Sequence, residues 1–160
     1  MFFRLPNADF RQGSGEANRQ AAQDLARSGE PVGLLAMDGD DAVGWVAVAP
    51  RAVYRRLDRS LVAAPPDRAE DLSGVWSVTC FYIHRTARRR GVGAELLDAA
   101  VRYATRRGAT TVEAYPVDTK GEKTSSADLY HGTLSMFLDA GFMLVERRGV
   151  RRALVRKTVG

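Results

Sequence analysis

The stretch "RRRGVGAELLDAAVRYATRRG", residues 88–108, places three arginines and two glycines directly before an amphipathic helix. Its apolar side chains recur at helical spacing along one stripe, at Val92, Leu96, Leu97, Ala100, Val101 and Ala104. Cations at the start of a helix are unfavourable, because the helix dipole is already positive there. We therefore expect a strongly anionic ligand at this turn.

Gly91 and Gly93 would let the main chain bend and bring an anion close to the unpaired amides of the helix start. Arginines beside them would add charge-assisted hydrogen bonds to phosphate oxygens. The stretch lacks the G-x-x-x-x-G-K-[ST] pattern of a nucleoside-triphosphate loop. It also has Leu96 where a dinucleotide-binding fingerprint needs its third glycine.

The elements around this turn predict an α+β fold. Residues 74–84, "GVWSVTCFYIH", are β-branched and aromatic, which predicts a strand buried on both faces. The other predictions are a helix over 16–29, a β-hairpin over 32–50, a short helix near 51–57, a strand over 110–118, a helix over 133–141 and a strand pair over 142–157. Gly44 in the hairpin indicates a bulge or a close backbone approach.

Composition limits the class of protein. The 160 residues suit a single domain over 1–160, and a net charge of +5 indicates an anionic partner. We find no nucleic-acid recognition motif and expect no nucleic-acid partner. No stretch is apolar enough to span or bind a membrane, and the N-terminus lacks a signal peptide, so we expect a cytoplasmic protein. One cysteine and two histidines predict no metal site.

The sequence Arg88-Arg89-Arg90-Gly91-Val92-Gly93, after a strand and opening a helix, resembles the pyrophosphate-binding R-x-x-G-x-G motif of the GCN5-related N-acetyltransferase (GNAT) family. The segment "FLDAGF", residues 137–142, looks like the Y-x-x-x-G-F element of that family. The stretches "GLLA", "VGWVAVAPR", "CFYI" and "EAYPVD" also look like an uncharacterised bacterial branch of the family. The resemblance implies a mixed central sheet whose parallel middle strands splay apart, with helices on its flanks.

The resemblance also implies acetyl-CoA as cosubstrate and a small-molecule or peptide amine as acceptor. Family members often form homodimers, so a homodimer is one expected assembly. Transferred residue by residue, the coenzyme contacts would come from the second half of the strand, the arginine–glycine turn and the closing helix. These residues are Cys80, Phe81, Tyr82, Ile83, Arg88, Arg89, Arg90, Gly91, Val92, Gly93, Ala94 and Phe137.

Phe137 stands where the family often has a tyrosine that protonates the leaving thiolate, and phenylalanine has no proton to give. Ser135, Tyr130 and His131 are candidates to replace it, each with an alternative role as a helix-surface, loop or cap residue. For the general base, we consider Glu113 and Tyr82, which lie on the two central strands. Glu113 has an alternative role as a surface partner for an arginine.

Cys80 could form an acetyl-cysteine intermediate, or it could be a small hydrophobic residue in a buried strand. We favour the second interpretation and direct attack of the amine in a ternary complex. The sequence thus predicts an acetyl-CoA-dependent N-acetyltransferase acting on a primary amine. The alternative is an acyl-CoA-binding sensor or scaffold domain with impaired catalysis, because the usual tyrosine is missing.

Overall fold

The computed structural model describes residues 2–122, 124 and 129–160. In it, the stretch 88–108 forms a short turn and helix α3 (Val92–Arg106), as its periodicity predicts. Gly91 precedes the helix and Gly108 follows it, both with left-handed backbone, at φ 83° and 87°. The buried residues of α3 are the predicted apolar stripe, apart from the half-buried Val92 at its start.

Around α3 the described chain forms one mixed sheet of six strands in the order β1-β2-β3-β4-β6-β5. Only β3 and β4 pair in parallel, so the predicted α+β class is confirmed. The strands are β1 (Leu34–Asp38), β2 (Asp41–Pro50), β3 (Val75–Ile83), β4 (Thr111–Ala114), β5 (Met143–Arg148) and β6 (Arg152–Thr158). The other helices are α1 (Asn7–Gln12), α2 (Glu16–Arg27) and α4 (Leu134–Asp139), with 3-10 turns η1 (Arg51–Val53), η2 (Leu57–Arg59), η3 (Arg85–Ala87) and η4 (Leu129–His131).

The two central parallel strands separate halfway along their length. β4 pairs with β3 only between Val75 and Val78, whereas β3 continues to Ile83. Beyond β4, Pro116 has no amide hydrogen to donate, and Val117 bridges to the segments at Thr133 and Arg152 instead. The predicted splay between the middle strands is therefore present, and one edge of β3 has no strand beside it within the described residues.

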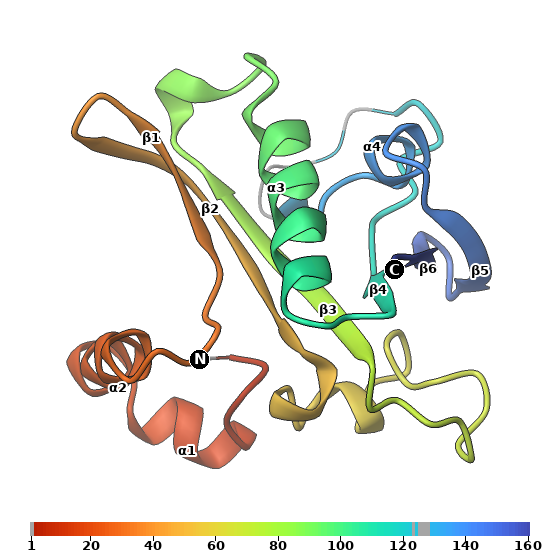
Figure 1. Ribbon diagram of the computed structural model, residues 1–160, viewed down its shortest axis with the longest axis horizontal. Coiled ribbons are helices and arrows are strands. Elements are labelled where there is room, and N and C mark those ends of the chain that lie inside the picture. Colours follow the sequence, from red (N-terminus) through yellow and green to blue (C-terminus); the bar gives the residue numbers. More distant parts are fainter. Residues whose placement is uncertain (1, 123, 125–128) are drawn as a thin grey trace.

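The sheet has two different faces. One face packs against α3 and α4 and carries the larger core, which includes Val46, Val78 and Phe81. Figure 1 shows α3 crossing in front of β2 and β3, with α1 and α2 below and to the left. The opposite face carries a second core around Tyr54, Leu57 and the turns η1 and η2. The two faces therefore offer different surroundings to ligands.

Two sequence predictions need correction. The strand over 74–84 is not buried on both faces to its end, because Cys80 is half-buried and Tyr82 is 55% exposed. The helix α1 was not predicted, since its six residues carry no apolar stripe and bury no side chain.

Gly44 is confirmed as a close approach: a Cβ there would lie 3.1 Å from side-chain carbons of Val92 and Leu96. No helix within the described ranges has the length and apolarity to cross a bilayer.

Candidate active site

The turn before α3 has the geometry of an anion cradle. Arg89 and Gly91 both adopt left-handed backbone, at φ 62° and 83°, which reverses the chain between η3 and the helix. No side chain caps the helix start. The amides of Ala94 and Glu95 donate to the Gly91 carbonyl at 2.9 and 3.2 Å, so the earlier amides of the turn are the ones that a helix cannot pair internally.

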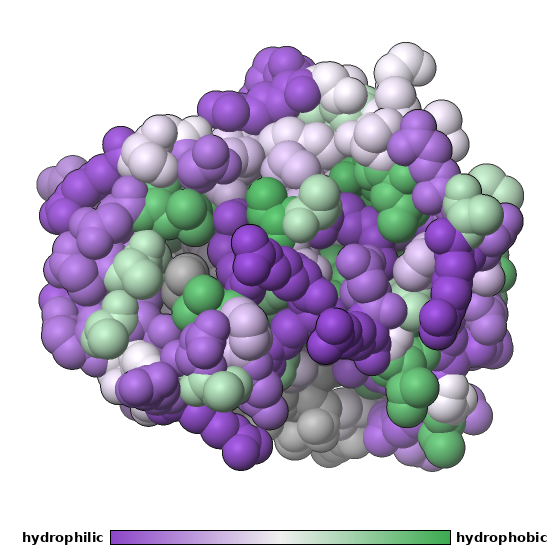
Figure 2. All heavy atoms as spheres, turned by 90° about the horizontal axis from the view of Figure 1, so that it is seen from below, coloured by the Kyte–Doolittle hydropathy of each residue, from purple (hydrophilic) through white to green (hydrophobic). Residues whose placement is uncertain are grey.

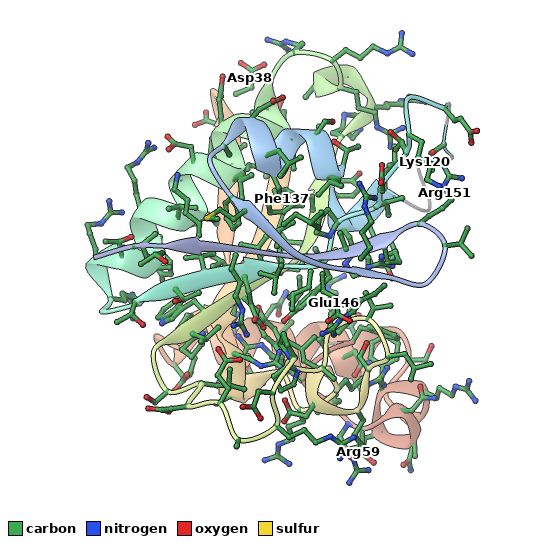
Figure 3. The ribbon with its side chains drawn as sticks, turned by 90° about the vertical axis from the view of Figure 1, so that its right-hand side faces the viewer. Asp38, Arg59, Lys120, Phe137, Glu146 and Arg151 are labelled. Carbon is green, nitrogen blue, oxygen red and sulfur yellow. The ribbon has the colours of Figure 1, made fainter. Side chains whose placement is uncertain are left out.

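The arginines of the turn are exposed and lie around the end of β3. Arg88 Nε donates to the Ile83 carbonyl oxygen at 3.2 Å. Arg90 Nη1 lies 3.5 Å from Oδ2 of Asp38, the last residue of β1, in an exposed ion pair. Asp38 is labelled near the top of Figure 3. Within the described part of the chain, these contacts leave most donors of the guanidinium groups unused, so phosphate oxygens could be bound here.

The predicted coenzyme-contacting residues of β3 divide between the two faces of the sheet. A β-bulge in β3 makes Thr79 an extra residue without a partner in the register, because Val78 and Cys80 pair with the consecutive residues Val48 and Ala47 of β2. Phe81 packs in the core beneath α3. Thr79 and Cys80 both line a pocket on the opposite face. The bulge therefore turns two successive side chains toward this pocket, where the splay begins.

Phe137 is completely buried, contrary to the expectation that its ring contacts the coenzyme. Its ring centroid lies 6.1 Å from that of Phe81 and 5.1 Å from that of Phe142, both edge-on. Figure 3 shows the side chain between α4 and the sheet. Phe137 thus packs in the core and supplies no hydroxyl to the site. Its ring has no exposed surface that a ligand could contact.

Glu113 belongs to a buried ionic network. Its Oε1 accepts from Arg51 Nη1 at 2.9 Å, from the Tyr115 hydroxyl and from Ser77 Oγ at 3.2 Å. Its Oε2 accepts from Arg156 Nε at 3.1 Å. Since both oxygens are occupied in a site 1% exposed, Glu113 is a partner of arginines, buried rather than at the surface, and not an accessible base.

Ser135 and Tyr130 lie in different places. Ser135 is exposed in the first turn of α4 and lines a groove between α3 and α4 with Ala94 and Met136. Tyr130 lines the pocket that also contains Thr79 and Cys80. The structure therefore brings only Tyr130 of these two candidates beside Cys80.

His131 is buried behind Tyr130, with ring centroids 4.0 Å apart. Its Nδ1 is 2.8 Å from the Thr79 carbonyl oxygen, which can only accept, so Nδ1 carries the proton. Burial and the neighbouring Arg152 cation lower the pKa of His131 to about 3. The imidazole is therefore neutral at physiological pH and joins η4 to the bulge of β3.

The pocket beside Cys80 has a volume of about 460 Å³ and a largely apolar lining. Part of its wall comes from the first residues of the chain, Phe2, Phe3 and Arg4, which the sequence analysis did not assign to any site. The adjacent aromatic residues in "MFFRL" were the one feature of the sequence that could have indicated an apolar contact there. Figure 2 shows hydrophobic side chains bordering a hollow on the side where α1 and α2 lie. Burial raises the pKa of the Cys80 thiol, which disfavours a reactive thiolate.

Comparison with known proteins identifies a family from the sequence and similar folds among solved structures. The sequence model described as "Acetyltransferase (GNAT) family" matches residues 1–132. No curated protein matches the sequence. Similar solved structures include an N-acetyltransferase from Staphylococcus aureus Mu50, with 12% identity, a TM-score of 0.58 and coverage of 91% of this chain and 77% of that one.

Two further structures cover similar shares. Ribosomal-protein-alanine N-acetyltransferase from Brucella melitensis has 18% identity and a TM-score of 0.56, covering 90% of this chain and 78% of its own. Ard1 from Thermoplasma volcanium has 15% identity and a TM-score of 0.55, covering 94% and 86%. At these identities the likeness concerns the fold alone.

Proposed function

The chain belongs to the acetyltransferase (GNAT) family, and we propose that it transfers an acetyl group from acetyl-CoA to a primary amine by direct attack in a ternary complex. The observation that carries this proposal is the junction of the anion cradle at Gly91 with the unpaired edge of β3. Either the cradle or the strand edge alone would be weak support for coenzyme A binding. Together they offer a phosphate-binding turn and, next to it, a strand edge that can accept an extended chain.

The residues of this junction suit coenzyme A. The amides of Gly91 to Ala94 and the side chains of Arg88 and Arg90 would hold the diphosphate. The main chain of Cys80 to Ile83 would pair with the pantetheine amides, and its N–H groups could polarise the acetyl carbonyl. Gly93 is close to Ile83, since a Cβ would lie 3.2 Å from Ile83 Cδ1. Acetyl-CoA supplies an activated acetyl thioester at this place.

For the proton transfer we propose Tyr130. Attack by a neutral amine forms the amide bond, the carbon–sulfur bond breaks, and the proton lost by the nitrogen must reach the thiolate. Tyr130 lines the pocket beside Cys80 and is stacked on the fixed ring of His131, so its hydroxyl can pass that proton on. Glu113 is proposed as a structural residue, Tyr82 and Ser135 as residues outside the proton path.

The decisive experiment measures release of coenzyme A with a thiol reagent, using acetyl-CoA and a panel of primary amines. Turnover above the amine-free rate supports the transferase. Tight binding of acetyl-CoA without turnover on any amine would favour the alternative, a sensor or scaffold domain. Tyr130→Phe should lower kcat about 100-fold or more while acetyl-CoA binding stays unchanged, and Ser135→Ala should leave both unchanged.

A further inference from the structure

The pocket beside Cys80 is lined by apolar side chains from three parts of the chain. The N-terminal segment contributes Phe3, α2 contributes Leu25, and β2 contributes Trp45 and Ala47. Its volume of about 460 Å³ is within the range of sites for small organic molecules. The pocket therefore has room for the body of an acceptor whose nitrogen points toward Cys80.

The described residues that line this pocket carry positive charge and no negative charge. Among the described residues that line it, Arg4 is the one charged side chain, and no carboxylate is present. The Arg4 guanidinium lies 5.2 Å from the ring centroid of Tyr54 and donates to the Pro31 carbonyl. A second ammonium group on an acceptor would be desolvated here without an anionic partner and repelled by Arg4.

The pocket wall contains a buried hydroxyl group, that of Tyr54, without a hydrogen-bond partner among the described residues. The side chain of Tyr54 is 4% exposed. Burial raises the pKa of Tyr54. The Thr79 hydroxyl and the Arg4 guanidinium lie close enough to lower that pKa in part, but neither reaches hydrogen-bond geometry with the Tyr54 hydroxyl. A buried hydroxyl without a partner is unfavourable, so a ligand atom that satisfies it would gain affinity.

From the apolar lining, the absence of a carboxylate among the described lining residues and the unpaired hydroxyl, we propose that the acceptor is an apolar monoamine, an alkyl- or arylalkylamine without a second cation, and that Tyr54 positions its nitrogen. This inference rests on the proposed acetyl transfer. The same lining assists the reaction, because a desolvated ammonium beside Arg4 loses its proton more readily than in water, where its pKa is ~10.4. The neutral amine that attacks is then supplied by the pocket itself.

The test compares kcat/KM for 2-phenylethylamine and 1,4-diaminobutane with acetyl-CoA. We expect 2-phenylethylamine to be preferred at least tenfold. Leu25→Glu places a carboxylate on the pocket side of α2, a helix with no buried residue, and should shift the ratio at least tenfold toward the diamine. Gln23→Glu adds the same charge on the exposed side of α2 and should leave the ratio unchanged. A diamine preference in the unmodified protein would overturn the proposal.

A second arm requires no turnover. Trp45 lines the pocket whereas Trp76 lies in the core beneath α3, so titration with 2-phenylethylamine should change the Trp45 emission and 1,4-diaminobutane should not. Tyr54→Phe should raise the apparent Kd or KM for 2-phenylethylamine about tenfold without lowering stability, because it removes an unpaired hydroxyl. If no amine is acetylated, acetyl transfer fails, and the fluorescence titration still decides what the pocket binds. Equal responses to both amines would contradict our inference.

Discussion

His131 Nδ1 donates to the carbonyl oxygen of Thr79 at 2.8 Å, and this bond joins η4 to the bulge of β3 at the place where β4 diverges. The chain between β4 and α4 thus returns to the strand that β4 has left. Because the bond fixes the backbone next to Cys80 and supports Tyr130, it links the shape of the splay to the proposed proton path.

The neutral state of His131 predicts a pH-dependent stability. The pKa of His131 is about 3 in the folded chain and about 6.5 when unfolded, so the unfolded state binds the extra proton between these values. The contribution of His131 to the free energy of unfolding should therefore be completely present above pH 6.5. Below that pH it should decrease by up to about 1.4 kcal/mol per pH unit. Urea unfolding from pH 7 to pH 5 measures this slope.

His131→Asn serves as the control, since an amide can still donate to the Thr79 carbonyl and has no proton to gain. Its free energy of unfolding should be less dependent on pH over the same interval. Equal slopes in the two proteins would show that His131 is not buried in its neutral form.

Glu113→Gln should destabilise the fold rather than remove a catalytic base. The change leaves Arg51 paired with Asp58 and Arg156 paired with Glu70. Because each arginine keeps one carboxylate, the loss should lie at the lower end of the cost of breaking a buried pair, about 3 kcal/mol. Denaturant unfolding should show that loss, while the remaining folded protein keeps the pH dependence of kcat. A stable variant with kcat reduced a hundredfold would restore Glu113 as the base.

Cys80→Ala should retain acetyl transfer within about threefold. Burial raises the pKa of the thiol, so a thiolate nucleophile is disfavoured at neutral pH. Steady-state rates measured on folded protein, with circular dichroism as the folding control, test this. Complete loss of activity in a folded variant would support an acetyl-cysteine intermediate.

Much of this architecture could be predicted from sequence because it rests on local signals. The stripe of α3, the glycines at its ends and the apolar run of β3 each specify a short element. The burial of Phe137 and of Glu113 could not be predicted, because it depends on which face of a helix or strand meets which neighbour. Arg51 lies 62 residues before Glu113, and neither position carries a local signal of their contact.

The pocket was missed for a related reason. Its wall combines Phe3, Leu25 and Trp45, which are distant in sequence and none of which belongs to a motif. The bulge that turns both Thr79 and Cys80 toward it leaves no signature in an unbroken apolar strand. Sequence periodicity assumes regular alternation, and one extra residue reverses it.

Calorimetric titration of acetyl-CoA into the protein and two glycine variants tests the central claim, that the turn at Gly91 holds the coenzyme diphosphate. Gly91 and Gly108 lie just outside the two ends of α3 with nearly equal φ, 83° and 87°. A Cβ at either position would meet nothing closer than 3.9 Å among the described residues. Gly91→Val and Gly108→Val should therefore carry similar backbone strain, about 1–2 kcal/mol each.

We predict that the unmodified protein and Gly108→Val bind one acetyl-CoA per chain with similar affinity, and that Gly91→Val loses at least 100-fold in affinity while remaining folded. Equal affinities in the two variants, or no heat on titrating the unmodified protein, would contradict the assignment of the coenzyme site.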